Sequence, residues 1–153
     1  MQTFLPFPDF AASARVLDRQ RLGKQRLEVL QLLAATTGWR VVDGALERVE
    51  RPGWVNHPAA VMWRGYGAAL ARYGLAVCAE WVGRGYRDTC ADKIRLIAGV
   101  LPKTGDPEWL GDEDFHLAHR SNLVRKDRDH YGALWPDVPA DLPYVWPGAA
   151  LAA

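Results

Sequence analysis

The sequence has 153 residues, of which 49% are hydrophobic and 24% charged, with 19 Lys and Arg against 18 Asp and Glu for a formal net charge of +1. This length and balance predict one globular domain with one core, and they exclude a disordered or fibrous chain. Because the overall charge is nearly neutral, a nucleic-acid partner has to be held by a local basic patch.

The chain shows no sign of export or membrane insertion. Cys78 and Cys90 are too few for a disulfide framework, and the start lacks the basic and apolar regions of a signal peptide. Arg64, Arg72 and Glu80 interrupt the most apolar region, which leaves no run of roughly 20 apolar residues to cross a bilayer. We therefore expect a cytoplasmic protein without a membrane partner.

The first third of the chain predicts an extended lead-in, two helices and a hairpin. Residues 1–10, MQTFLPFPDF, alternate in polarity and hold two prolines, which suits an extended segment fixed against the core. Residues 9–17 predict one or two helical turns. Asp18 is placed to cap a longer helix to about residue 35, and Gly38 to end it. An Asp-Gly pair within residues 39–56 predicts a small hairpin, with a plain loop as the alternative.

The remaining two thirds predict further helices and an extended end. Residues 58–83 read as one long central helix that begins at Pro58. Thr89 resembles the cap of a helix that Pro102 ends. A helix from about Asp112 to residue 127 and another turn at residues 127–135 precede a Pro-rich tail. We therefore predict a mainly α fold, a compact single-domain helical bundle over residues 1–153.

The stretch LDRQRLGKQRLEVLQLL, residues 17–33, places a polar stripe on its predicted helix, apart from the leucines. This stripe contains Asp18, Arg21, Lys24, Gln25 and Glu28. A solvated face with ion pairs of about 0.2–0.5 kcal/mol each explains such a stripe. However, Gly23 costs about 1 kcal/mol inside a helix relative to alanine, which favours a close approach by backbone or ligand.

As a functional site, this stripe would combine an acid with cations. A Glu28 carboxylate held by Arg21 and Lys24 would stay ionised and could stabilise a developing sugar cation or move a proton, while the cations hold phosphate. Crowding by Arg21 favours a neutral, nucleophilic Lys24 amine, whereas Glu28 acts in the opposite sense. The sequence leaves the balance between these two effects open.

The motifs WVNHP and MWRGY suggest nucleic-acid contacts near the start of the central helix. Asn56 as an N-cap is the structural interpretation, and His57 would then stand at the helix end that attracts phosphate. Trp63 and Arg64 are the aromatic and basic types that grip a nucleic-acid strand, although core packing of Trp63 is equally consistent.

The motif HLAHRSNLVRKD suggests further phosphate contacts. His116 and His119 are spaced to grip a metal, but no cysteine lies near and no third ligand is fixed by spacing, so we predict no metal and no cofactor. The other interpretation is a set of phosphate donors, with a solvated helix surface as the alternative. This set comprises His119, Arg120, Ser121, Asn122, Arg125 and Lys126.

The stretches LDRQRLGKQRLEVLQLL, NHPAAVMWRGY, LARYGLAVCAEW with GYRDT, and HRSNLVRKDRDHY followed by LPYVW resemble the pyrimidine-dimer DNA glycosylase superfamily, which is phage endonuclease V-like. The resemblance is to an uncharacterised bacterial and phage branch, and it spans nearly the whole chain except residues 37–54. It implies a mainly helical domain in which Glu28 and the N-terminal α-amine share the active site. The amine attacks the sugar of the damaged nucleotide and forms an imine that permits strand cleavage.

The attacking group differs from the family pattern at one point. Gln2 is bulky, so Met1 would stay and supply the α-amine, which in model peptides titrates near 8 against roughly 10.4 for lysine. Lys24, one helical turn from Glu28, and water are the alternatives. In addition, Leu27 stands where the family has an arginine beside its glutamate, and Arg26 and Arg21 are the nearest substitutes.

We therefore predict a monomeric DNA glycosylase, with or without AP-lyase action, for damaged or modified bases in duplex DNA. The catalytic candidates are Glu28, Lys24, Met1 and His57, and Trp63 and Tyr144 would stack on an extruded base. The predicted substrate and phosphate contacts are Arg21, Gln25, Asn56, Arg64, His119, Arg120, Ser121, Asn122 and Lys126. The alternatives are a catalytically silent nucleic-acid-binding domain and an enzyme acting on free nucleotides or nucleosides, which the near-neutral charge would suit.

Overall fold

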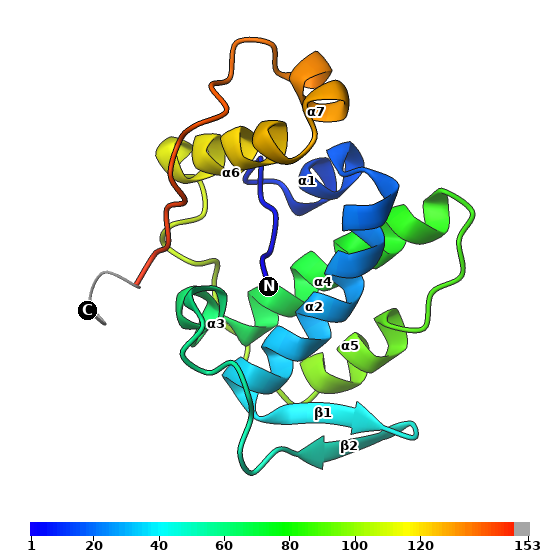
Figure 1. Ribbon diagram of the computed structural model, residues 1–153. Helices are drawn as coiled ribbons and strands as arrows, with labels where there is room; N and C mark the ends of the chain where they lie inside the picture. Colours follow the sequence, from blue (N-terminus) through cyan, green and yellow to red (C-terminus); the bar gives the residue numbers. More distant parts are fainter. Residues whose placement is uncertain (149–153) are drawn as a thin grey trace.

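The computed structural model describes residues 1–148, and it confirms the mainly α fold (Figure 1). Residues 149–153, the end of the predicted domain, lie outside the described residues. No helix within the described range is long and apolar enough to cross a membrane. The elements are α1 (Phe10–Val16), α2 (Arg19–Thr37), β1 (Trp39–Val42), β2 (Ala45–Arg48), α3 (Pro58–Trp63), α4 (Gly67–Gly83), α5 (Ala91–Ala98), α6 (Glu113–Lys126) and α7 (Arg128–Leu134).

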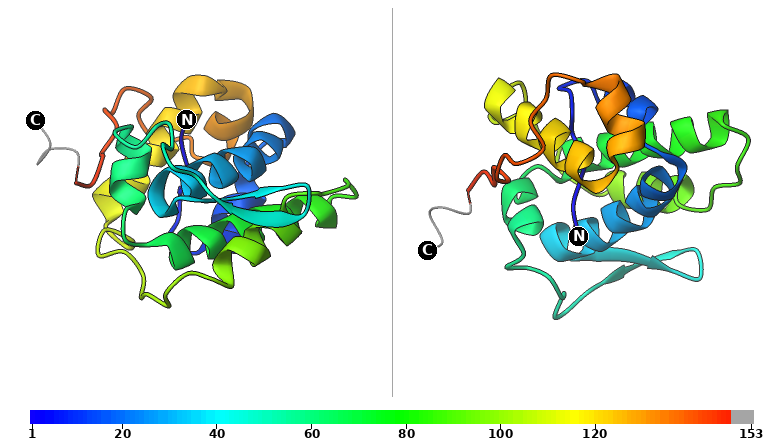
Figure 2. Two further views of the ribbon diagram at one scale, coloured as in Figure 1. Left: turned by 90° about the horizontal axis from the view of Figure 1, so that it is seen from below. Right: turned by 45° about the horizontal axis from the view of Figure 1, so that its top comes forward.

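Helix α4 is the centre of the bundle, and α1, α2 and α5 pack against it. Burying its apolar side chains, with those of α2, removes them from water and supplies the main driving force for the fold. The hairpin contacts α2 and α5 and lies at the end of the molecule opposite α6 and α7 (Figures 1 and 2). The fully buried residues of the two central helices include Leu22, Val29, Leu32, Leu33, Leu70, Tyr73 and Val77.

The predicted long helix over residues 58–83 is wrong, because the chain breaks it into α3 and α4. Gly65 has a φ of +85°, a conformation that glycine adopts without the steric cost of a side chain. The apolar pattern continues across the break, which is why periodicity alone did not reveal it. As a result α3 turns toward the lead-in, where the buried Trp63 indole Nε1 donates to Thr3 Oγ1 at 2.9 Å.

Most predicted helix ends and the hairpin are confirmed. The Asp18 side chain caps α2 by accepting from Arg21 N, and Gly38 ends the helix in the left-handed conformation. The hairpin turns at Asp43 and Gly44, both with positive φ, as an Asp-Gly turn requires. The predicted Thr89 cap is wrong.

The start of α5 is capped by Asp88 instead of Thr89. The Asp88 carboxylate accepts from the backbone of Cys90 at 3.1 Å and of Ala91 at 2.8 Å. The same carboxylate forms an ion pair with Arg26 at 2.6 Å, so it is fixed from two sides.

The glycine inside α2 is explained by a side chain of α4. A Cβ at Gly23 would lie 3.0 Å from two ring carbons of Trp81. The close approach expected from the sequence is therefore real, and it is made by an indole ring. The Arg26 guanidinium lies over this ring, 4.3 Å from its centroid.

The lead-in and the C-terminal tail are both extended, as predicted. Figure 1 shows the lead-in running from the region of α6 and α1 toward α2 and α4, with the N-terminus beside these two helices. The tail returns past α6, where Leu142 N donates to Ser121 Oγ at 3.1 Å. It then reaches α3, and Trp146 lies edge-on to His57.

Candidate active site

A hollow of about 230 Å³ opens beside the start of the chain. The lead-in, the polar stripe of α2 and the end of α6 form its wall. The structure therefore brings together Met1, Lys24 and Glu28, three of the four predicted catalytic residues. The lining residues are Met1, Gln2, Phe4, Gln20, Arg21, Lys24, Gln25, Glu28 and Lys126.

Glu28 is the acid of this hollow, and only 7% of its surface is exposed. Its Oε2 accepts from Gln25 Nε2 at 2.8 Å and from the backbone nitrogen of Gln2 at 3.3 Å. Its Oε1 lies 3.6 Å from Nζ of Lys24, whose side chain is 71% exposed. The carboxylate is thus fixed in orientation, beside both an exposed cation and the residue that follows Met1.

Gln25 joins the lead-in to Glu28 and does not face outward. Its Oε1 accepts from Phe4 N at 3.0 Å and from the Tyr73 hydroxyl at 2.7 Å, and its Nε2 donates to Gln2 O at 2.7 Å and to Glu28. All the hydrogen-bonding positions of this buried amide are satisfied, and the donors and acceptors around it fix its orientation. The predicted phosphate contact of Gln25 is therefore corrected to an internal bridge.

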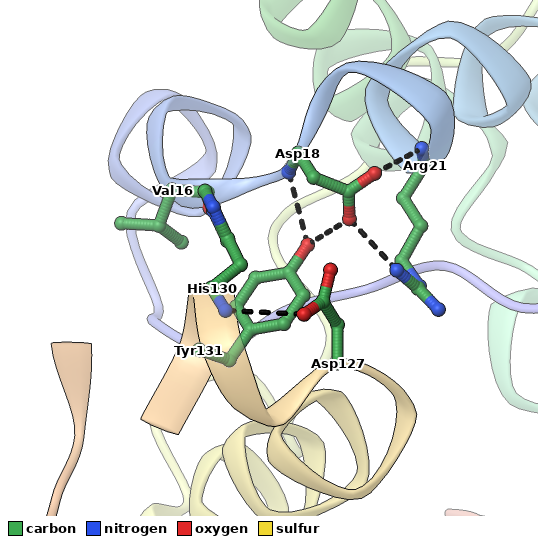
Figure 3. Close-up of polar contacts among 6 residues, drawn as sticks. All are labelled: Val16, Asp18, Arg21, Asp127, His130 and Tyr131. Carbon is green, nitrogen blue, oxygen red and sulfur yellow. Dashed lines mark hydrogen bonds and ion pairs between the residues drawn. The ribbon is translucent and has the colours of Figure 1, made fainter. Parts of the chain in front are cut away.

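Arg21 lines the hollow but pairs with Asp18 and not with Glu28 (Figure 3). Asp18 Oδ2 accepts from Arg21 Nη1 at 2.9 Å and from the Tyr131 hydroxyl at 2.5 Å. Burial raises the pKa of Asp18, but the hydrogen bonds from Tyr131 and Arg21 outweigh it and leave the pKa below its usual value. Tyr131 of α7 therefore fixes the first turn of α2 and, through it, the arginine at the rim.

His57 caps α3, which corrects the predicted cap at Asn56. His57 Nδ1 accepts from Ala59 N at 3.1 Å, while Asn56 is exposed in the preceding turn. Burial lowers the pKa of His57, the positive Met1 amino group lowers it further, and the charge of Glu28 raises it. His57 is outside the lining of the hollow, but the charges of both groups reach its ring.

The aromatic residues near His57 differ from those predicted. Trp63 is fully buried and has no free face for a base. Tyr144 is half-buried, and its ring lies 5.3 Å from that of Trp146. Trp54 is 61% exposed, has a φ of +64°, and its ring lies 5.7 Å from that of His57. Trp54 was not predicted as a site residue, because local composition does not separate exposed from buried tryptophans.

Most of the predicted phosphate donors on α6 are buried or hydrogen-bonded within the protein. His119, Ser121 and Asn122 are fully buried, with Asn122 Nδ2 donating to Ala118 O at 2.7 Å. Arg120 donates to Pro6 O at 2.7 Å and pairs with Glu113. Burial of these side chains contradicts their assignment as phosphate contacts.

Two further predicted cations are exposed, but they lie on different hollows. Lys126 lines the hollow of Glu28. Arg64 lines a separate hollow, where it donates to Val55 O at 2.6 Å. Arg125 donates to the carbonyls of Ala140 and Leu142 in the tail. Within residues 1–148, no three His, Cys, Asp or Glu side chains gather in a group that could hold a metal.

Comparison with protein families gives one match. The family model described as pyrimidine dimer DNA glycosylase matches residues 1–94. The matched part contains the lead-in, α2 with Lys24 and Glu28, and His57, but it ends before α6. Comparisons with curated proteins and with solved structures find no match. Because the match spans more than half of the 153 residues, the chain belongs to the pyrimidine dimer DNA glycosylase family.

Proposed function

We propose that this protein is a DNA glycosylase for pyrimidine dimers in duplex DNA, with Met1 and Glu28 as its catalytic residues. The observation that carries this proposal is the buried Glu28 carboxylate, which accepts from Gln2 N at 3.3 Å and shares one hollow with Met1. An acid is thereby held next to the residue that bears the α-amino group. Family membership supports DNA as the substrate.

The proposed reaction uses both groups on one sugar. The neutral amine of Met1 attacks C1′ as the glycosidic bond breaks, and the leaving base takes up a proton. The Glu28 carboxylate stabilises the positive charge that develops on the sugar. Opening of the sugar ring with loss of the proton on the nitrogen gives an imine between Met1 and C1′. Removal of a C2′ proton then expels the 3′ phosphate, which is the AP-lyase step.

Cations that line the hollow and two aromatic rings outside its lining would hold the DNA. Arg21, Lys24 and Lys126 line it and are suited to flanking phosphates, which contribute most of the salt-dependent affinity. Lys24 is already paired with Glu28, which suits a phosphate-binding ammonium better than a neutral nucleophile. Trp54 and Tyr144 are the accessible rings for an extruded base.

Borohydride trapping tests the proposal. The protein is incubated with one duplex that carries a single cyclobutane thymine dimer and with the same duplex undamaged, and borohydride reduces any imine to a stable amine. We expect a covalent adduct with the damaged duplex alone. Acetylation of the α-amine should abolish the adduct, whereas Lys24→Gln should retain it, as should Lys93→Gln, an exposed lysine of α5.

The alternatives give different results. Absence of both adduct and glycosidic-bond cleavage, with salt-sensitive retention of DNA, identifies a binding domain and contradicts the proposal. An enzyme of free nucleotides would bind monophosphates and ignore the duplex. Cleavage of the glycosidic bond without an adduct identifies water as the attacking group. Loss of the adduct in Lys24→Gln alone moves the nucleophile to Lys24.

A further inference from the structure

We propose that His116 and His119 are positioning residues for the catalytic amine, because they lock the backbone of Leu5 and so hold the lead-in in place against Glu28. This inference rests on the proposed role of Met1. It assigns to the two buried histidines of α6 a function other than metal or phosphate binding.

The hydrogen bonds assign opposite tautomers to the two rings. His116 Nε2 lies 2.9 Å from the backbone nitrogen of Gly111, which can only donate, so the proton of this ring is on Nδ1. His116 Nδ1 therefore donates to Leu5 O at 2.8 Å. His119 Nδ1 accepts from Leu5 N at 2.9 Å, so its proton is on Nε2.

The two rings thus offer Leu5 the donor and the acceptor that a neighbouring β-strand would offer. In a hydrogen-bonded pair of antiparallel strands, one residue exchanges both its N–H and its C=O with the partner. Here two side chains, one turn apart on α6, replace that partner. We call these two hydrogen bonds, from His116 and His119 to the backbone of Leu5, the lock. The lock fixes the extended segment at Leu5 without a sheet.

His119 has to be neutral for its Nδ1 to accept from Leu5 N. Burial and, to a smaller extent, the neighbouring His116 together lower the pKa of His119 to about 3. Burial also lowers the pKa of His116. A protonated His119 would lose the Nδ1 lone pair that accepts from Leu5, and each Nδ1 is occupied by Leu5 and so closed to a metal.

One buried polar atom of His119 has no partner. His119 Nε2, which carries the proton, has no hydrogen-bond partner among the described residues. An unpaired buried donor costs free energy. An apolar side chain at this position would remove that cost but would leave the buried Leu5 N without its acceptor.

Residues 2–4 connect the lock at Leu5 to the amine of Met1, and each of them is hydrogen-bonded to another part of the protein. Phe4 N donates to Gln25, Thr3 Oγ1 accepts from Trp63, and Gln2 bonds to Gln25 and Glu28. At about 3.3–3.6 Å per extended residue, Leu5 lies roughly four residues' length from Met1. Gln25 and Glu28 hold this segment from α2, and the histidines hold it from α6.

The test compares His119→Asn with His119→Leu. Asparagine places Oδ1 at the position of the histidine Nδ1, so it can still accept from Leu5 N, whereas leucine cannot. We expect Leu5 amide hydrogen exchange and acylation of the α-amine to be accelerated at least tenfold in His119→Leu and to stay within threefold of wild type in His119→Asn. With the damaged duplex, trapping should slow at least tenfold in His119→Leu while DNA affinity stays within twofold.

Each outcome decides between the two proposals. Faster Leu5 exchange with unchanged α-amine acylation and unchanged trapping overturns the positioning role. If the wild type forms no adduct at all, the proposed nucleophile fails, and the acylation rates alone still decide whether the lock holds the amine. If His119→Leu does not fold, His119→Gln takes its place, because its acceptor lies one bond farther from the backbone.

Discussion

At the scale of single residues, Glu28 owes its orientation to neutral donors. Gln25 Nε2 and Gln2 N both bond to Oε2, and the cation beside it, Lys24, is the outermost partner. A carboxylate fixed in this way needs no rearrangement to meet charge that develops on a sugar. In the proposed reaction its contribution is its negative charge.

Replacing Glu28 with Gln tests that contribution. We expect cleavage of the glycosidic bond in the dimer duplex to slow by about 10²–10⁴-fold, the range for loss of a charge-stabilising or proton-transferring group. Binding of the duplex should stay within about threefold, because the cations at the rim remain. Single-turnover kinetics and fluorescence anisotropy measure the two quantities. Undiminished turnover would remove Glu28 from the mechanism.

Gln25 should matter mainly for the stability of the chain start. Gln25→Leu leaves the Phe4 N–H and the Gln2 carbonyl buried without the amide, and each such group costs about 1–3 kcal/mol. We expect urea unfolding to show a loss of about 3 kcal/mol. Gln31→Leu, an exposed position of the same helix, should change stability by less than about 0.5 kcal/mol. Equal losses at both positions would contradict the bridge.

At the scale of secondary-structure elements, the contact of α2 with α4 depends on a glycine. Gly23→Ala gains about 1 kcal/mol of helix propensity, but its Cβ would lie 3.0 Å from the Trp81 ring. That ring is fixed by Arg26 above it and by its Nε1 bond to Arg87 O. Overpacking of this kind costs about 1–3 kcal/mol. After the gain in helix propensity we therefore expect a net loss of up to about 2 kcal/mol in thermal or urea unfolding.

Gly132 of α7 provides the matched control. A Cβ there meets nothing within 4 Å, so Gly132→Ala should stabilise the protein by up to about 1 kcal/mol. Stabilisation of similar size at Gly23 would show that the Trp81 contact does not exclude a side chain.

Elements with a local chemical signal were predictable from sequence, and those set by tertiary contacts were not. The Asp18 cap and the Asp-Gly turn follow from the residue types at those positions, and both predictions are confirmed. The break at Gly65 was not predicted, because apolar residues continue through it. The cap by Asp88 was missed because its carboxylate is held by Arg26 from another helix.

The same difference between local signals and tertiary contacts explains which residues around the hollow could be predicted from sequence. The α2 stripe predicted a polar cluster with Glu28, since helical spacing places these residues on one face. The polar residues of α6 were assigned to phosphate because polar side chains on a helix usually face solvent. In the fold, His116 and His119 instead face Leu5, and no local pattern in the sequence reveals that the lead-in needs these partners.

At the scale of the whole molecule, stability should fall on mild acidification. The pKa of His119 lies near 3 in the folded protein and about 6.5 in the unfolded chain. Between these values the unfolded state binds more protons, so stability is full above about pH 6.5 and declines toward pH 3, by up to about 1.4 kcal/mol per pH unit. His116 and His57 contribute in the same direction.

Urea unfolding from pH 7 to pH 4 measures this decline. Asp18 and Asp88, whose folded pKa values lie below their usual ones despite burial, lose their stabilising effect only at lower pH, below about 4. We expect His119→Asn to flatten the profile between pH 6 and pH 4. An unchanged slope in that variant would contradict a neutral, buried His119.

Duplex binding should depend on the cations of the hollow. Lys126→Gln should reduce the slope of log affinity against log salt concentration by about one unit, since one phosphate contact is lost. Lys103→Gln, an exposed lysine outside the hollow, should leave the slope unchanged. Equal slopes for the two variants would remove Lys126 from the DNA contact.

Mass-spectrometric sequencing of the borohydride-reduced adduct tests the central claim most directly, because it locates the bond between protein and sugar. After a check of the intact mass shows that the chain begins at Met1, we expect the sugar remnant on the α-nitrogen of Met1, and no adduct in Glu28→Gln. A remnant on Lys24 or any other side chain, or none on a substrate whose glycosidic bond has been cleaved, would contradict the account.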